Sequence, residues 1–147
     1  MQQAQSQDSA VHPSDAFKPE WLVSSQSIHS SGLMVRHHIE PADEIDLPAL
    51  THHCLILVLS STSSRQVTQF DGHKYDGRQG NHGEFWLLPA ARPGVFAWDG
   101  TDETIVLLLE PTQLAHVATE TEFVNPDRME LLPILIANDS QVASVQN

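Results

Sequence analysis

Histidines are the residues that most readily suggest chemistry, because the chain has nine of them among 147 residues. Imidazole nitrogens bind transition metals, but a stable site needs three or four ligands that converge. The two histidine pairs, His37–His38 and His52–His53, are adjacent in sequence. Adjacent residues of a strand point to opposite faces of a sheet, so neither pair is expected to share a metal. The sequence therefore predicts neither a metal nor another cofactor.

Catalytic motifs are absent from the sequence. It has no Gly-x-Ser-x-Gly nucleophile elbow, no phosphate-cradling loop and no His-Glu-x-x-His helix. Glu84 and Glu103 do not form a recognisable catalytic pair. We therefore expect a protein that is not an enzyme.

Aromatic side chains between His82 and Trp98 are the best candidates for contacts with a small ligand. Alternation along a strand puts Phe96 and Trp98 on one face, and it puts Trp86 on the face opposite to Phe85. These rings either fill the core or line an apolar pocket, where an indole N–H would act as a fixed donor. We take Trp86, Phe96 and Trp98 as pocket candidates.

Two polar residues complete the predicted ligand-binding set. His53 is expected at the mouth of a pocket or on a dimer surface. Arg92 lies in a turn, where its guanidinium could form a forked pair of hydrogen bonds with a ligand carboxylate, or could be solvated.

Short apolar runs separated by turn residues predict a mainly β fold. Phe85–Leu88 and Val95–Trp98 form a strand, tight turn, strand unit around its prolines and Gly94. The acidic stretch Glu40–Leu47 is predicted to be a loop. Other strands are predicted at Leu33–Ile39, Cys54–Leu59, Arg65–Phe70, His73–Tyr75 and Thr104–Leu109, with Asp71–Gly72 as a hairpin turn. About seven strands at such spacing predict a small barrel or jelly roll with an interior pocket.

The pattern becomes helical after Glu110. Pro111 suits a first helical turn, and Leu114, Val117 and Ala118 recur on one side of a helix that would end near residue 121. A second helical piece is predicted to begin at Asn125–Pro126 and to include Ile136, and a third to begin near Asn138. Two or three helices are thus predicted to follow the barrel.

The unit from His82 to Trp98 resembles the second half-motif of a cupin barrel, and more narrowly the effector-binding and dimerisation domain of AraC-type transcription regulators. Three other segments support the narrower resemblance: Pro48–His53, Leu107–Pro111 and Val124–Pro133. The resemblance covers residues 32–145. The DNA-binding half of that family, two helix-turn-helix units, has no counterpart in this sequence.

Length and pattern together predict one domain with three parts. Residues 1–29, rich in Gln, Ser and Asp, are expected to be a flexible leader, although Glu20–Val23 could fix it to the body. Residues 30–110 are expected to be the cupin-like barrel. Residues 111–147 are expected to be a helical dimerisation region that ends at the start of a linker helix.

Composition restricts the partners and the location. The formal net charge of −12 argues against direct binding to nucleic acid and to anionic membranes. No segment has the length and hydropathy of a membrane span, and no signal peptide is recognisable, so a cytoplasmic location is expected. The single cysteine, Cys54, excludes an internal disulfide and is expected to be an inert, buried thiol.

The resemblance implies a domain that senses a small-molecule effector and dimerises. Its partner would be a second copy, or a full-length relative that carries the DNA-binding half. Two other possibilities are a small metal-dependent cupin enzyme, which metal analysis would reveal, and a dimerisation module with a filled barrel and no ligand.

Overall fold

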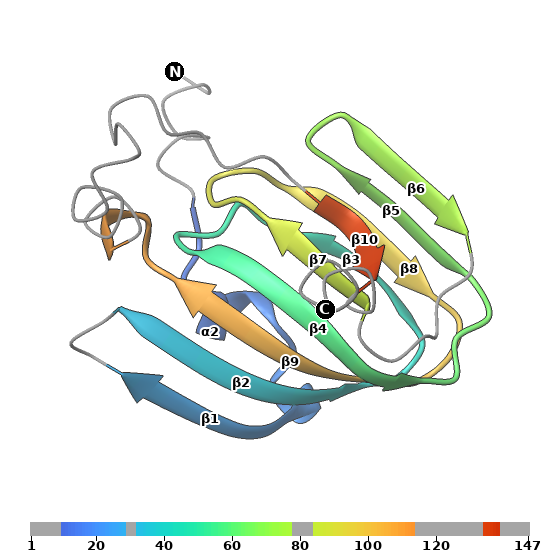
Figure 1. The fold of residues 1–147 in the computed structure, drawn as a ribbon, viewed down its shortest axis with the longest axis horizontal. Coiled ribbons are helices and arrows are strands. Elements are labelled where there is room, and N and C mark those ends of the chain that lie inside the picture. Colours follow the sequence, from blue (N-terminus) through green and yellow to red (C-terminus); the bar gives the residue numbers. More distant parts are fainter. Residues whose placement is uncertain (1–9, 29–31, 78–83, 114–133, 139–147) are drawn as a thin grey trace, which may run out of the picture.

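Two antiparallel sheets that face each other make up most of the described part of the chain (Figure 1). The computed structural model describes residues 10–28, 32–77, 84–113 and 134–138. The six-stranded sheet consists, in spatial order, of β1 (Leu22–Ile28), β2 (Leu33–Glu40), β9 (Asp102–Leu109), β4 (His53–Ser61), β7 (Glu84–Leu88) and β10 (Ile134–Asn138). The four-stranded sheet consists of β3 (Asp43–Leu47), β8 (Gly94–Trp98), β5 (Gln66–Phe70) and β6 (His73–Gly77). The predicted mainly β fold is confirmed, as a two-sheet, jelly-roll-like sandwich rather than a closed barrel.

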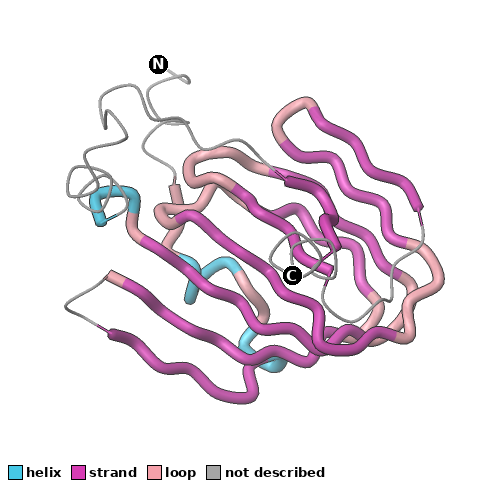
Figure 2. The backbone as a smooth tube through the Cα atoms, in the orientation of Figure 1, coloured by secondary structure: helices cyan, strands magenta, loops and turns pink. Residues whose placement is uncertain are grey.

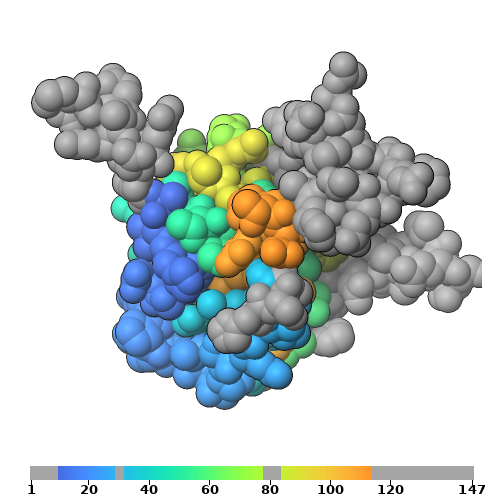
Figure 3. Space-filling model, turned by 90° about the vertical axis from the view of Figure 1, so that its left-hand side faces the viewer, coloured from blue at the N-terminus to red at the C-terminus, as the bar shows by residue number. Residues whose placement is uncertain are grey.

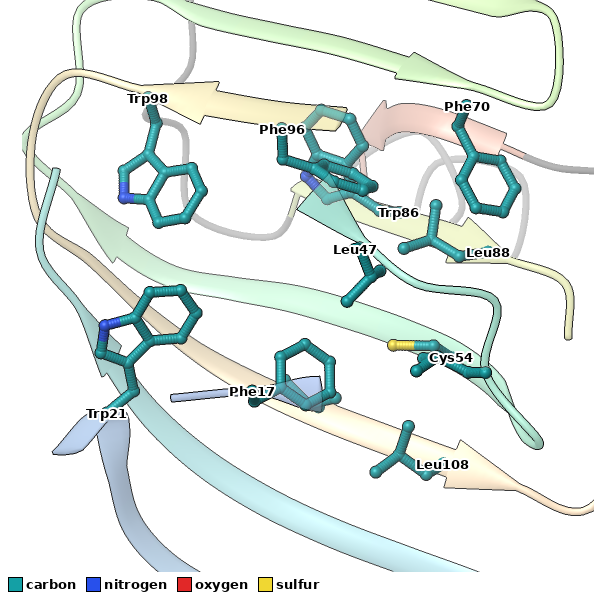
Figure 4. Close-up of a cluster of buried hydrophobic side chains, with 12 residues drawn as sticks. Phe17, Trp21, Leu47, Cys54, Phe70, Trp86, Leu88, Phe96, Trp98 and Leu108 are labelled. Carbon is teal, nitrogen blue, oxygen red and sulfur yellow. The ribbon is translucent and has the colours of Figure 1, made fainter. Parts of the chain in front are cut away.

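Alternation along the strands produces the core between the sheets. In β9, Asp102, Thr104, Val106 and Leu108 are buried, and the residues between them are only half-buried. The aromatic and aliphatic residues that meet there come from both sheets, as Figure 4 shows. Burial of this face is the main favourable contribution to folding, because it removes apolar surface from water.

The connection between β7 and β8 differs from the prediction. The strands were expected to form a unit around a tight turn, but β7 pairs with β4 and β10, whereas β8 pairs with β3 and β5. The segment between them therefore crosses from one sheet to the other. Its backbone is held by a hydrogen bond of 2.8 Å from Ala91 N–H to the carbonyl of Leu50, with Ala91 at a φ of 71°. Local turn residues do not specify which sheet the next strand joins.

Three stretches are strands where none was predicted: Leu22–Ile28, Asp43–Leu47 and Ile134–Asn138. Asp43–Leu47 was expected to be part of a loop, but Ile45 and Leu47 face inward and alternate with the exposed Glu44 and Asp46. This is the period-two pattern of a half-buried strand, and the acidic residues obscured it.

Near the C-terminus, Ile134–Asn138 forms β10 and pairs with β7, so the predicted helix that included Ile136 does not extend through this stretch. Its β-branched residues suit a strand, and the pairing gives hydrogen-bond partners to backbone groups at the edge of β7. Residues 111–113 are helical, as predicted from Pro111. The other predicted helical stretches, residues 114–133 and 139–147, lie outside the described residues.

The N-terminal segment is more ordered than the predicted leader. Residues 10–28 contain the helix α2 (Pro13–Ala16), the 3-10 helix η1 (Pro19–Trp21) and the strand β1, which pairs with β2. Phe17 and Trp21 are 5% and 4% exposed and belong to the core. Two apolar aromatic side chains thus fix this segment to the sandwich. The helices are short (Figure 2), and none in the described part of the chain could cross a membrane.

Cys54 lies on the inner face of β4 and is fully buried as a free thiol, as predicted. Burial raises the pKa of this thiol strongly, so the reactive thiolate is disfavoured.

A test of the sheet packing follows from Gly94, the first residue of β8. A Cβ atom at this position would lie 2.7 Å from Cδ1 of Phe70 and 3.0 Å from the carbonyl oxygen of Gln69. We expect Gly94→Ala to lower the free energy of unfolding by roughly 1–3 kcal/mol, as overpacking of a core does. The neighbouring Val95 is 40% exposed, so Val95→Thr should change stability by less than about 0.5 kcal/mol. Urea unfolding measures the stability of both variants. Equal unfolding midpoints for Gly94→Ala and the unmodified protein would show that β8 does not pack this closely on β5.

Candidate ligand-binding cavity

A cavity of about 40 Å³ lies between the two sheets. A cavity needs roughly 10–15 Å³ to hold one water molecule, so this space admits about three water-sized groups. Its lining contains all three tryptophans of the chain. The lining residues are Phe17, Trp21, Glu40, Ile45, Leu47, Ile56, Val58, Gln66, Trp86, Phe96, Trp98, Asp102 and Thr104. The site thus combines mostly apolar walls with four polar side chains, the usual composition of a small-molecule pocket.

The aromatic walls are rings packed edge to face. The ring centroids of Trp21 and Trp98 are 5.7 Å apart, and those of Trp86 and Phe96 are 6.0 Å apart. Figure 4 shows Trp98 on β8 facing Trp21, which comes from the N-terminal segment. The indole N–H of Trp98 donates to the backbone carbonyl of Glu40 over 3.2 Å. These contacts fix the wall, because each large ring is held by another ring or by a hydrogen bond.

A buried row of charged and polar side chains lies beside the cavity on the inner face of β2. Nε–H of Arg36 donates to Nε2 of His38 over 3.0 Å, and the Nδ1 atom of His38 lies 2.9 Å from Oε2 of Glu40. Arginine nitrogens only donate, so Nε2 of His38 accepts and its ring proton is on Nδ1, from which it is donated to Glu40. Arg36 is 5% exposed and His38 fully buried. The imidazole therefore connects a buried guanidinium to the carboxylate that reaches the cavity.

Asp102 is the second carboxyl group of the cavity. It is the cross-strand partner of Glu40, and both side chains line the space. The hydroxyls of Ser61 and Ser63 both donate to its Oδ1 atom. Burial raises the pKa of Asp102 above its ordinary value, and the nearby Glu40 adds to the rise, while the two serine hydrogen bonds oppose it. Two carboxyl groups therefore share one end of a largely apolar cavity.

The N-terminal segment closes one side of this arrangement. The ring of Phe17 packs edge-on against His38 at 5.2 Å and lies 5.9 Å from the guanidinium carbon of Arg36. Trp21 lies 6.5 Å from the His38 ring. In Figure 3 the segment, in blue, covers one side of the body. The cavity wall, the buried row and the N-terminal segment are therefore in direct contact.

The structure separates the five predicted ligand-binding residues into two groups. Trp86, Phe96 and Trp98 line the cavity, and their inward facing agrees with the alternation argument. His53 lies elsewhere, on the outer face of the six-stranded sheet beside Leu55 and Leu107, and its Nδ1 accepts from the N–H of Ala90. Arg92 pairs with Asp71 over 2.7 Å at the surface and does not reach the cavity.

The facing argument holds for His37–His38, which lies within β2, but His52 precedes β4 and is buried rather than solvent-exposed as expected. His38 is fully buried and His37 faces outward, where it contacts Glu103 over 2.7 Å. His52 is buried and packs edge-on against His12 at 5.2 Å. Within the described residues, no three His, Cys, Asp or Glu side chains converge as metal ligands. His82 and His116 lie outside the part of the chain that the structure describes.

Comparison with known proteins gives a likeness of fold only. No protein-family model and no curated protein matches the chain. Among solved structures, the AraC-like transcriptional activator CuxR is 20% identical, with a TM-score of 0.48 over 65% of this chain and 35% of that chain. A cupin protein from Bacteroides fragilis is 12% identical, with a TM-score of 0.40 over 59% of this chain and 76% of that chain.

A Cupin 2 conserved barrel domain protein from Salinispora arenicola is 11% identical, with a TM-score of 0.39 over 60% of this chain and 72% of that chain. This chain spans about a third of the length of CuxR. These likenesses concern the cupin-like fold and assign no activity, ligand or partner to the chain.

Asp102 allows a test of the cavity's electrostatics. Because folding raises its pKa, the protonated form favours folding, and this contribution is lost as the pH rises through the folded-state pKa. Asp102→Asn keeps an oxygen for the two serine donors and removes the cost of the buried charge. We expect this variant to melt above the unmodified protein at pH 7, with a difference that shrinks as the pH falls toward the ordinary carboxyl value.

Glu103→Gln is the matched control, because the Glu103 side chain is 38% exposed on the opposite face of β9. Its melting temperature should change little. A pH-independent difference for Asp102→Asn, or a lower melting temperature at pH 7, would contradict the raised pKa.

Proposed function

We propose that the chain is a ligand-sensing and dimerisation domain, similar to the N-terminal half of an AraC-type transcription regulator. The observation that carries the proposal is the cavity between the sheets. Three aromatic residues selected from the sequence line it, and Glu40 and Asp102 form its polar end. The sequence motifs that resemble the family support the regulatory role. No catalytic function is assigned to the site, because binding alone accounts for its features.

The polar end supports a binding role on energetic grounds. Burying Glu40 and Asp102 in a core costs free energy that apolar residues would avoid. A filled core would gain nothing from two carboxyl groups at this position. Groups of this kind are expected where a ligand supplies the missing partners.

Dimerisation is proposed from the resemblance to the family, which implies that a helical face between Pro111 and Leu132 supports it. The partner would be a second copy of this chain or a full-length relative with a DNA-binding half. A net charge of −12 argues against contact between this chain and nucleic acid itself. In this proposal the chain acts on DNA only through its partner.

Intrinsic fluorescence tests the binding role directly, because all three tryptophans line the cavity. We would titrate the protein with a panel of amines, alcohols, amides and carboxylic acids of a few heavy atoms each and record tryptophan emission. At least one compound is expected to give a saturable change. Val58 is 1% exposed and lines the cavity, so Val58→Phe should fill the space and abolish that change.

Leu57→Phe is the matched control, because Leu57 is the neighbouring residue of β4 and faces away from the cavity. It should keep the ligand response. If no compound produces a saturable change, or if both variants respond like the unmodified protein, the cavity is not a ligand site and the domain is a filled module.

A further inference from the structure

Most of the free hydrogen-bonding atoms beside the two carboxyl groups of the cavity are oxygen acceptors. Of the four polar residues, Thr104 donates its hydroxyl to Oε2 of Glu40, and Gln66 directs its amide nitrogen to Oγ1 of Thr68. Within the described part of the chain, hydrogen bonds reach only Oε2 of Glu40 and only Oδ1 of Asp102. Among the described contacts, three oxygen acceptors remain free: Oε1 of Glu40, Oδ2 of Asp102 and the amide oxygen of Gln66. The second N–H of the Gln66 amide is the one free donor that these contacts leave among the four side chains. A ligand that pairs with the three acceptors must therefore bring donors.

The carboxyl groups at this end also favour a cation. Glu40 and Asp102 are cross-strand partners on the inner face of the same sheet, and both line the cavity. Among the residues that the structure describes, the buried Arg36 reaches Glu40 only through the His38 ring, and Asp102 is bound by neutral hydroxyls. One buried guanidinium thus faces two carboxyl groups. Burial raises the pKa of Asp102, and a bound positive charge would favour its ionised form.

The remaining walls suit the same kind of ligand. Aromatic faces attract a cation that lies within about 6 Å of the ring centre, and tryptophan does so most strongly. Trp21, Trp86 and Trp98 all line the space. The protein's net charge of −12 also raises the local concentration of cations and lowers that of anions.

Size limits the ligand to a few heavy atoms. The cavity of about 40 Å³ admits about three water-sized groups. A primary ammonium group carries three N–H donors, which matches the three oxygen acceptors, and a short alkyl chain fits the aromatic and aliphatic walls. A metal ion would leave the apolar part of the cavity without a contact.

We propose that the cavity binds a small primary alkylammonium ion, with its ammonium group between Glu40, Asp102 and Gln66 and its alkyl group against the tryptophans. This inference rests on the proposed ligand-binding function and names the chemical class of the ligand. The acceptors from the two sheets would enclose the ammonium group, since Glu40 and Asp102 come from one sheet and Gln66 from the other.

The test uses ethylammonium chloride at pH 7 as the probe, with tryptophan emission as the readout. Ethanol is the neutral match of equal heavy-atom number, acetate is the anionic match, and sodium chloride controls for ionic strength. We expect a saturable change with ethylammonium and none with the three other solutes. Butylammonium should bind less tightly because its chain exceeds the space.

Variants locate the site. Asp102→Asn should weaken ethylammonium binding by about tenfold or more, because it removes a charged hydrogen-bond acceptor. Glu103→Gln, on the outer face of the same strand, should leave the affinity unchanged. Circular dichroism and thermal melting verify that both variants are folded, and the series of probes on the unmodified protein tests the inference without any variant.

The outcomes separate this inference from the proposed function. If ethanol, acetate or another neutral or anionic compound saturates while ethylammonium does not, the cavity is a ligand site for a different chemical class and the inference fails. It also fails if ethylammonium binds equally well to Asp102→Asn. If no compound of any class gives a saturable response, both the inference and the proposed function fail.

Discussion

Burial of charge on the inner face of β2 is the constraint on which the rest of the structure depends. Arg36, His38 and Glu40 occupy alternate inward positions of that strand, where an apolar core would normally be. A charge taken out of water must find a partner, or it destabilises the fold by several kcal/mol. In this protein the three groups form a line of hydrogen bonds, in which the guanidinium donates to the imidazole and the imidazole donates to the carboxylate. This fixes the Glu40 carboxylate beside the cavity.

Neighbouring elements are positioned by the same row. Thr104 on β9 donates to Glu40, and the indole of Trp98 on the opposite sheet donates to the Glu40 carbonyl. From the N-terminal side, Phe17 packs on both Arg36 and His38. The two sheets and the N-terminal segment therefore meet at one set of polar contacts, around which the aromatic rings are arranged. A change in any of these contacts would alter the geometry of the cavity wall.

Sequence reasoning selected three aromatic residues that line the cavity and missed its polar residues. The alternation of β7 and β8 sorted Trp86, Phe96 and Trp98 by face but did not say which face is inward, and the structure places all three inward. The same argument, applied to the predicted strands Leu33–Ile39 and Thr104–Leu109, puts Arg36 and His38 on one face of the first and Thr104 on one face of the second. Glu40 and Asp102 lie just outside those predicted strands, in the observed β2 and β9. The polar residues within the predicted strands were the signal available, because a buried polar residue is more informative than a buried apolar one.

Other features could not be read from local sequence. Proline and glycine between β7 and β8 predict a turn, but the sheet that β8 joins is decided by pairing with β3 and β5, which lie far away in the chain. His53 and Arg92 were selected for their chemistry, and their positions are set by Ala90 and Asp71, which no motif connects to them. Phe17 and Trp21 lie in a segment whose polar composition suggested disorder. Two aromatic residues are enough to hold it on the core.

The protonation state of His38 is the most direct test of this account. Long-range nitrogen–proton NMR spectra of uniformly ¹⁵N-labelled protein distinguish the two ring nitrogens, and His38→Gln identifies the His38 signals among those of the nine histidines. At pH 7 we expect a proton on Nδ1 and none on Nε2, because Nε2 accepts from Arg36 and Nδ1 donates to Glu40. A proton on Nε2 would mean that Arg36 does not donate to His38, and the buried row that positions Glu40 would not exist.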